Sequence, residues 1–290
     1  MKFPIGSMAL VCHDAGAANL AIAWLSAIPS LDCHAVLTGP ALSLAKEAGL
    51  SARYYSTLSE AFMNASWLLT GTGWASVLEH DARKLAQLKN IRSIAVLDHW
   101  VNYQNRFERN HEIVLPDEIW VADDEALRIA SACFPFTQII QQPNIYLQTT
   151  INRITPPPTI ENVLYLLEPT RNNWGRQDLG EFQALDYFMD HRAKVGISRE
   201  TPIRLRPHPS DQPGKYDNWL KKHRETATLD RSHSLAESIS LATWVAGCET
   251  AALVIGMAAA RRALCTLPPW APACRLPHIG LIHLKLIADG

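Results

Sequence analysis

Short, almost continuous apolar runs recur along this chain, and each ends in glycine, aspartate or a polar turn. In the N-terminal half they cover residues 8–12, 33–39, 67–73, 93–100, 118–123 and 137–143. Runs of this kind are typical of strands that are buried on both faces of a parallel sheet. The stretches between them, such as residues 76–90, carry apolar positions at helical spacing. The alternation predicts an α/β fold of the doubly wound type.

The pattern stops in TTINRITPPPTI, residues 149–160, where three consecutive prolines favour an extended spacer over a helix or a central strand. A second set of apolar runs follows at residues 162–169, 202–209, 226–230, 243–247 and 263–267. We therefore expect two facing, doubly wound Rossmann-like domains, residues 1–155 and 156–290. Such domains would leave a crevice at the carboxyl ends of their strands, where open α/β sheets bind ligands.

Composition excludes some classes of function. The 290 residues carry a formal net charge of −1 without a Lys/Arg run, so we expect no nucleic-acid partner. The longest apolar run, residues 251–260, is shorter than the ~20 residues that a membrane span needs. The start indicates a first strand and no signal peptide. Six cysteines without a CxxC pair indicate reduced, buried thiols, so we expect a cytoplasmic protein and leave peripheral membrane association and oligomeric state open.

The segment RLRPHPSD, residues 204–211, holds a histidine between two prolines at the end of an expected strand. An imidazole fixed in this way can donate a hydrogen bond to a phosphate oxygen, which makes His208 a candidate for stabilising a leaving nucleotide. Arg204 and Arg206 share one face of the strand. Arg206 can neutralise phosphate; alternatively, both arginines simply line a sheet edge.

The segment VAGCETAALVIG, residues 245–256, predicts a short strand that breaks at Gly247 into a helix whose first turn carries Glu249 and Thr250. Unpaired N–H groups at a helix start favour an anion. Glu249 suits a ribose hydroxyl or a base, and Thr250 a phosphate, although an ordinary first turn also favours Glu and Thr. Arg171, after the first strand of the second half, can clamp phosphate with two hydrogen bonds or pair with a surface carboxylate.

Polar residues also follow the strands of the first half. His13 and Asp14 come directly after the first strand, beside Gly16, and are candidates for the floor of a cleft. The alternative is that Asp14 or Asn19 caps the next helix. Trp74 follows Gly-Thr-Gly at another strand end, in a turn that would display its indole.

Asp98, His99 and Trp100 close the most apolar strand of the first half. A carboxylate and an imidazole beside an aromatic ring that can cover a sugar face suit general-base catalysis on a hydroxyl. In the alternative reading, Asp98 caps the next turn and Trp100 belongs to the domain core.

The order and spacing of RLRPHPSD and VAGCETAALVIG resemble the donor domain of GT-B glycosyltransferases. The resemblance is closer to bacterial sialyltransferases and some Kdo (3-deoxy-manno-octulosonate) transferases, which use CMP-activated sugars, and it extends from about Val163 to Leu267. It implies a glycosyltransferase of polysaccharide biosynthesis that needs neither a metal ion nor another cofactor. Domain 156–290 would bind the CMP-linked sugar donor, and domain 1–155 the glycan or glycolipid acceptor.

The resemblance also suggests roles for residues. A carboxylate of the acceptor-side domain serves as base in the sialyltransferases, which points to Asp98, with Asp14 as the alternative; the chain lacks the paired acids and glycine of that family. His208, Thr250 and an arginine would stabilise the departing nucleotide.

Two other functions fit the same sequence. A sugar-nucleotide epimerase or hydrolase that resembles UDP-N-acetylglucosamine 2-epimerase could use His13, Asp14, Asp98 and His99 as acid–base groups. A non-catalytic module that binds nucleotide sugars would keep the fold without the chemistry. No histidine spacing typical of a metal site is present, so we expect no metal.

Overall fold

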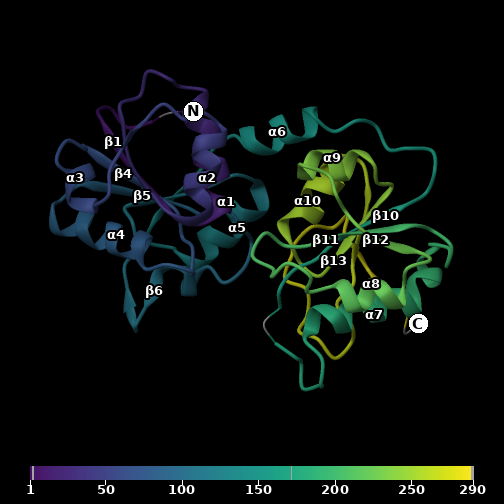
Figure 1. Ribbon diagram of the computed structural model, residues 1–290. Helices are drawn as coiled ribbons and strands as arrows, with labels where there is room; N and C mark the ends of the chain where they lie inside the picture. Colours follow the sequence, from purple (N-terminus) through teal and green to yellow (C-terminus); the bar gives the residue numbers. More distant parts are fainter. Residues whose placement is uncertain (2, 171, 289–290) are drawn as a thin grey trace. The chain divides into compact units, whose positions relative to one another are not determined.

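The computed structural model describes residues 1, 3–170 and 172–288, and the chain divides into two compact units, Met1–Gln148 and Thr149–Gly290 (Figure 1). The first unit contains a parallel sheet of strand order β3-β2-β1-β4-β5-β8-β9. Its strands are β1 (Met8–Cys12), β2 (Cys33–Leu37), β3 (Arg53–Tyr54), β4 (Trp67–Thr70), β5 (Arg92–Val96), β8 (Glu118–Val121) and β9 (Gln138–Gln141).

Helices connect most of these strands. They are α1 (Ala15–Ser26), α2 (Gly39–Glu47), α3 (Leu58–Phe62), α4 (Leu78–Leu88) and α5 (Asp124–Cys133), with α6 (Ile145–Asn152) at the boundary of the units. A 3-10 helix η1 (Gln104–Phe107) and an antiparallel hairpin of β6 (Glu108–Arg109) and β7 (Glu112–Ile113) lie between β5 and β8.

Both faces of the first sheet are covered. Along β1, Met8, Leu10 and Cys12 belong to a core shared with α1, whereas Ala9 and Val11 belong to a core shared with α3 and α4. Successive side chains of a strand point to opposite faces, so every position of β1 is buried, which explains its unbroken apolar sequence. Burial of each such large side chain stabilises the fold by roughly 1.5–3 kcal/mol.

The second unit contains a parallel sheet of strand order β12-β11-β10-β13-β14-β15. Its strands are β10 (Val163–Leu166), β11 (Ile203–Arg206), β12 (Ala227–Leu229), β13 (Trp244–Gly247), β14 (Arg262–Cys265) and β15 (Ile282–His283). Its helices are α7 (Gly180–His191), η2 (Arg192–Val195), α8 (Asp217–Lys222), α9 (Leu235–Ser240), α10 (Ala251–Ala258) and α11 (Leu284–Ala288). In Figure 1, α9 and α10 lie on one side of this sheet and α7 and α8 on the other.

These sheets confirm the predicted fold class, an α/β fold with two doubly wound Rossmann-like units. The predicted strands of both halves are present, each with both ends within four residues of its expected bounds. The short edge strands β3 and β15 and the β6–β7 hairpin were not predicted, because two-residue strands carry no periodicity that could be recognised.

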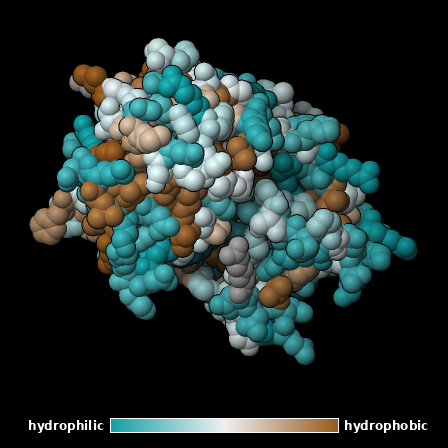
Figure 2. All heavy atoms as spheres, turned by 60° about the vertical axis from the view of Figure 1, so that its left-hand side comes forward, coloured by the Kyte–Doolittle hydropathy of each residue, from teal (hydrophilic) through white to brown (hydrophobic). Residues whose placement is uncertain are grey.

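On the face drawn in Figure 2, hydrophilic side chains dominate and hydrophobic ones stand singly or in small groups. Within the described residues, no helix combines the length and the apolar character that crossing a membrane requires.

Candidate functional site

Each sheet reverses its strand order at one place, between β1 and β4 in the first unit and between β10 and β13 in the second. Ligands of open α/β sheets bind beyond the carboxyl ends of the strands at such a switch point. We call the residues there the first-unit site (His13, Asp14, Trp74, Glu79 and Asp98) and the second-unit site (Glu168, His208, Glu249 and Thr250). Each site is described within its own unit.

A buried carboxylate, Glu79 in the first turn of α4, joins the loops of the first-unit site. Its Oε1 accepts the backbone N–H of His13 at 3.0 Å, and its Oε2 accepts that of Gly73 at 2.6 Å. Glu79 is 1% exposed. Burial raises the pKa of Glu79, although the two N–H groups and Arg83 oppose this shift. The residue therefore positions the loops that follow β1 and β4.

We expect Glu79→Gln to change how stability depends on pH. Because the folded protein holds the Glu79 proton more tightly than the unfolded chain, this carboxyl stabilises most at acid pH, and its contribution falls as pH rises through the raised pKa. The variant should lose about 1–3 kcal/mol at acid pH, because one of the two backbone N–H groups then faces the glutamine NH₂ instead of an oxygen. This loss should shrink towards neutral pH, because ionisation of the buried Glu79 destabilises the wild type. Urea unfolding at several pH values, with the exposed Glu47→Gln as control, measures it; a pH-independent difference would refute this role.

His13 and Asp14 form a pair at the end of β1. His13 Nδ1 lies 2.7 Å from Asp14 Oδ1, and Asp14 Oδ2 accepts the backbone N–H of Trp74 at 3.2 Å. Asp14 occupies the N-cap position of α1, yet its two oxygens are engaged by the imidazole and the Trp74 amide. A carboxylate that holds the Nδ1–H of a histidine orients the ring for proton transfer at Nε2.

Asp98 follows β5 and lies against the start of α1. Its Oδ1 accepts a hydrogen bond from Arg106 Nη1 at 2.9 Å, and a Cβ added at Gly16 would overlap its Oδ2. Arg106 also donates to Thr72 Oγ1 at 3.3 Å and to the carbonyl of Val101 at 3.1 Å. The Arg106 side chain is 7% exposed and that of Asp98 is 19% exposed, so the carboxylate is the partner that reaches solvent.

The aromatic candidates of the first unit lie in different surroundings. Trp74 is 48% exposed, and the Arg106 guanidinium lies 6.0 Å from its ring centroid. Trp100 is partly buried and donates its indole N–H to the carboxylate of Asp123 at 3.0 Å. His99 Nδ1 accepts the backbone N–H of Trp100 at 3.0 Å. Of these, Trp74 displays its ring most openly for stacking on a ligand.

In the second unit, α10 packs closely against β13, and the end of β13 packs closely against β10. A Cβ at Gly247 would come within 2.7 Å of the Leu166 carbonyl oxygen, and one at Gly256 would overlap Val245. Thr250 has extended backbone (φ −71°, ψ 145°), and its Oγ1 accepts the N–H of Ala252 at 3.4 Å. The prediction that Glu249 and Thr250 lie in the first helical turn is therefore wrong: Thr250 is the N-cap, and α10 begins at Ala251.

Glu249 connects three segments of the second unit. Its backbone N–H donates to Glu168 Oε2 at 3.0 Å, and its carboxylate accepts the backbone N–H of Arg275 at 3.0 Å and the Arg275 Nε–H at 3.1 Å. Burial raises the pKa of Glu168, and the Glu249 N–H opposes that shift. The Glu249 side chain is thus oriented by an ion pair with the loop after β14.

His208 is exposed in the loop after β11, and its ring is held by Ser210. The backbone N–H of Ser210 donates to His208 Nδ1 at 3.1 Å, and Ser210 Oγ lies 2.7 Å from the same atom. Asp211 accepts the backbone N–H of His208 at 2.9 Å. Because a backbone N–H can only donate, Nδ1 is an acceptor, and the neutral ring carries its proton on Nε2. His208 is thus set up as a hydrogen-bond donor through Nε2.

Arg204 and Arg206 point to the opposite face of β11 from Ile203 and Leu205, and both bind Asp230. The two Asp230 oxygens lie 2.7 Å from Arg204 Nη1 and 2.9 Å from Arg206 Nη1. Burial alone would raise the pKa of Asp230, but hydrogen bonds, chiefly from Ser238 and Arg206, hold it below its usual range. Arg206 thus belongs to an ion-pair cluster within the unit.

One predicted site residue cannot be placed in the structure, and two residues of the sites were not predicted from the sequence. Arg171 lies outside the described residues. Glu79 was missed, although a signal exists: Glu79 and Arg83 are four residues apart on the helical face that carries Ala82 and Ala86, where charges are unusual. Arg275 was missed because no periodic segment surrounds it.

Comparisons with known proteins identify the fold. No protein-family model matches the chain, and no curated protein matches it. Among solved structures, S. aureus MnaA with UDP is similar over 89% of this chain and 78% of its own, with a TM-score of 0.61 and 10% identity. A putative UDP-N-acetylglucosamine 2-epimerase from Listeria monocytogenes (TM-score 0.62, 10% identity) covers 90% of this chain, with 79% of its own matched. Anabaena Alr3699/HepE with UDP and glucose (TM-score 0.62, 8% identity) covers 98% of this chain and 88% of its own.

At these identities the similarity shows the fold alone. The two parallel-sheet units are of the GT-B type, as the sequence predicted.

Proposed function

We propose that this chain is a nucleotide-sugar enzyme that acts on a UDP-linked sugar. In this proposal the second unit binds the nucleotide, and the first unit supplies acid–base groups. The observation that carries it is the fold shared with solved structures of a UDP complex and of UDP-N-acetylglucosamine 2-epimerases. The CMP-linked donor suggested by the sequence has no support among these structures, so we propose UDP in its place.

The second-unit site has donors suited to a phosphate group. The start of α10 at Ala251 favours an anion, although the Thr250 side chain already accepts the Ala252 N–H, and the His208 Nε2–H is a hydrogen-bond donor. Glu249 next to this helix start is suited to a ribose hydroxyl. Glycines at 247 and 256 let the strand and helix approach closely, as in other nucleotide-binding α/β units.

The first-unit site favours acid–base chemistry over simple binding. An epimerase must remove a proton from one face of a carbon and return one to the other, so it needs at least two acid–base groups. The His13–Asp14 pair and Asp98 are such groups, each oriented by hydrogen bonds. This arrangement supports the epimerase or hydrolase reading of the sequence.

Glycosyl transfer is the second candidate. A glycosyltransferase of kitacinnamycin is similar to this chain with a TM-score of 0.53. The exposed Trp74 ring suits stacking on an acceptor sugar. Transfer would use Asp98 to deprotonate the acceptor hydroxyl.

A thermal-shift panel of UDP, UMP, CMP, CDP and GDP at equal concentration and low salt tests the nucleotide assignment. Any nucleotide that binds the native state stabilises it by mass action, by about 2.7 kcal/mol at 100 times its Kd. If UDP is the bound nucleotide, it should therefore raise the melting temperature most. Low salt matters because phosphate contacts are screened by ions. A panel led by CMP would restore the CMP-sugar assignment, and a flat panel would oppose nucleotide binding altogether.

A further inference from the structure

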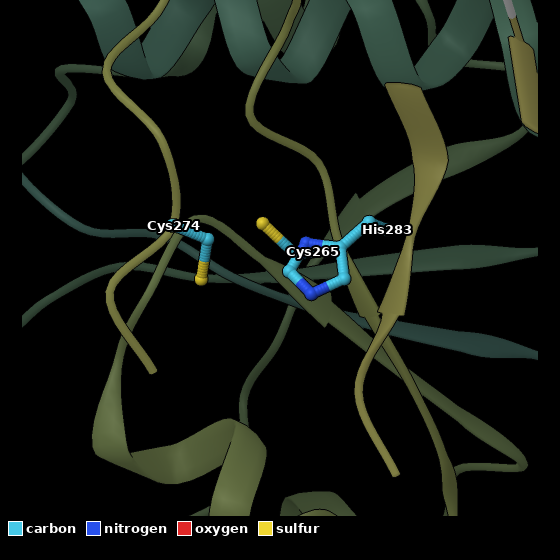
Figure 3. A group of neighbouring side chains, drawn as sticks. All are labelled: Cys265, Cys274 and His283. Carbon is cyan, nitrogen blue, oxygen red and sulfur yellow. The ribbon is translucent and has the colours of Figure 1, made fainter. Parts of the chain in front are cut away.

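Two cysteines and a histidine of the second unit bring their side chains together at one edge of the sheet. Cys265 ends β14 and His283 ends β15, and the two are register partners in this parallel pair. Cys274 lies in the loop between the strands, residues 266–281. One ligand atom from each residue lies within 4.8 Å of the other two. Figure 3 shows the Cys274 side chain entering from a separate segment of chain, beside Cys265 and His283.

These donors are the set that thiophilic metal ions prefer. Zinc binds cysteine thiolates at about 2.3 Å and imidazole nitrogen at about 2.0–2.1 Å, and two Cys with one His leave the fourth tetrahedral position for water or another ligand. Ligand atoms around such an ion stand roughly 3.5–3.8 Å apart, so small side-chain rotations suffice here. Two thiolates would balance the charge of Zn²⁺, which suits a buried Cys265 and half-buried partners.

The loop that carries Cys274 supports a bound ion. Residues 266–281 form no helix or strand in the structure, and their length exceeds that of most loops in compact domains. A clip that closes such a loop onto the sheet removes conformational entropy from the unfolded chain. Four prolines, at 268, 269, 272 and 277, stiffen the same segment.

A metal ion bound to Cys274 would also restrict the loop that contacts the second-unit site. Cys274 directly precedes Arg275, whose backbone N–H and guanidinium bind the carboxylate of Glu249. Glu249 in turn donates its N–H to Glu168. An ion held by Cys274 would therefore fix the loop that orients Glu249 before α10.

We propose that Cys265, Cys274 and His283 form a binding site for one thiophilic divalent cation, Zn²⁺, which fastens the loop after β14 to the sheet edge. The three ligands are spaced nine residues apart, which matches no zinc signature, so the sequence alone predicted no metal site. A Cys265–Cys274 disulfide is the competing state of the two sulfurs, and the third donor, an imidazole, favours the ion over the disulfide.

The test uses the reduced full-length chain, freed of metal and titrated with Co²⁺ and then Zn²⁺ without oxygen. Cobalt should bind in a ratio of one per chain, give a thiolate-to-cobalt charge-transfer band, and be displaced by zinc. Cys274→Ser and His283→Asn should each lower the affinity at least about 100-fold, since even loss of an outer partner of a metal ligand costs 10–100-fold. The half-buried Cys133→Ser in the first unit is the control and should bind cobalt as wild type does.

Three results would overturn the site. They are absence of cobalt and zinc binding by the reduced protein, a His283→Asn variant with undiminished affinity, and a native Cys265–Cys274 disulfide found by peptide mapping together with no metal binding after reduction. The substituted cysteine and histidine are half-buried rather than core residues, and circular dichroism of each variant checks that it folds.

Discussion

Asp98→Asn should lower turnover of a UDP-linked sugar by about 10²–10⁴-fold while the thermal shift caused by UDP stays close to that of wild type. The carboxylate reaches solvent at the carboxyl end of β5, where an acid–base group would act, and it lies outside the unit proposed to hold the nucleotide. Asparagine keeps an oxygen that can accept the Arg106 hydrogen bond, so the fold should lose only about 1–3 kcal/mol. Steady-state kinetics beside the thermal shift measures both effects.

Asp14→Asn and Asp81→Asn complete this comparison. Asp81 is exposed in α4, and its variant should behave as wild type. A larger loss in Asp14→Asn than in Asp98→Asn would assign the proton transfer to the His13–Asp14 pair. Loss of the UDP shift in a folded Asp98→Asn protein would show that the roles of the units are assigned the wrong way round.

His208→Ala should weaken UDP binding and lower turnover by roughly 10²–10³-fold, the effect of removing one preorganised donor to a developing charge. Ser210 fixes the ring so that Nε2 carries the proton, which is the state that can donate to a phosphate oxygen. The residue is exposed, so its truncation should leave the melting temperature of the unliganded protein almost unchanged. Calorimetric titration with UDP measures the binding loss directly.

The exposed His233 of the same unit provides the matched control. His233→Ala should bind UDP like wild type, because the hydrogen bond to Glu237 at 2.9 Å comes from the His233 backbone N–H, which the substitution keeps. His208→Ala with wild-type affinity and rate would show that His208 shapes its loop without contacting the ligand.

The fold could be predicted from sequence because strand identity was encoded locally. The run at residues 8–12 contains no polar position, and the structure buries all of it on both faces of the sheet. Helix starts have local signals of the same kind: Ser234 and Glu237 are spaced as in a capping sequence, and in the structure the Ser234 hydroxyl accepts the N–H of Glu237 at 3.2 Å. Such features depend on neighbours a few residues apart in the chain.

The two sites were harder to predict from the sequence, because their contacts join segments that lie far apart in the chain. Glu79 accepts a hydrogen bond from His13, 66 residues away, and Arg275 meets Glu249 across 26 residues. Arg206 shows the same limit: its sequence context suggested either a phosphate or a sheet edge as its surroundings, and in the structure Asp230, 24 residues away in the chain, lies beside it. Sequence periodicity assigns a side chain to a face of an element but does not identify what packs against that face.

The measurement that tests the central claim most directly is incubation of the purified protein with UDP-N-acetylglucosamine in deuterated water without any acceptor, followed by NMR. We predict that the UDP-linked sugar is consumed without acceptor, with deuterium entering the sugar ring if the reaction is an epimerisation, or with free sugar and UDP if it is a hydrolysis. Asp98→Asn should slow this conversion by about 10²–10⁴-fold. Recovery of unchanged substrate under conditions in which an added acceptor, or a CMP-linked sugar, is turned over would contradict the account.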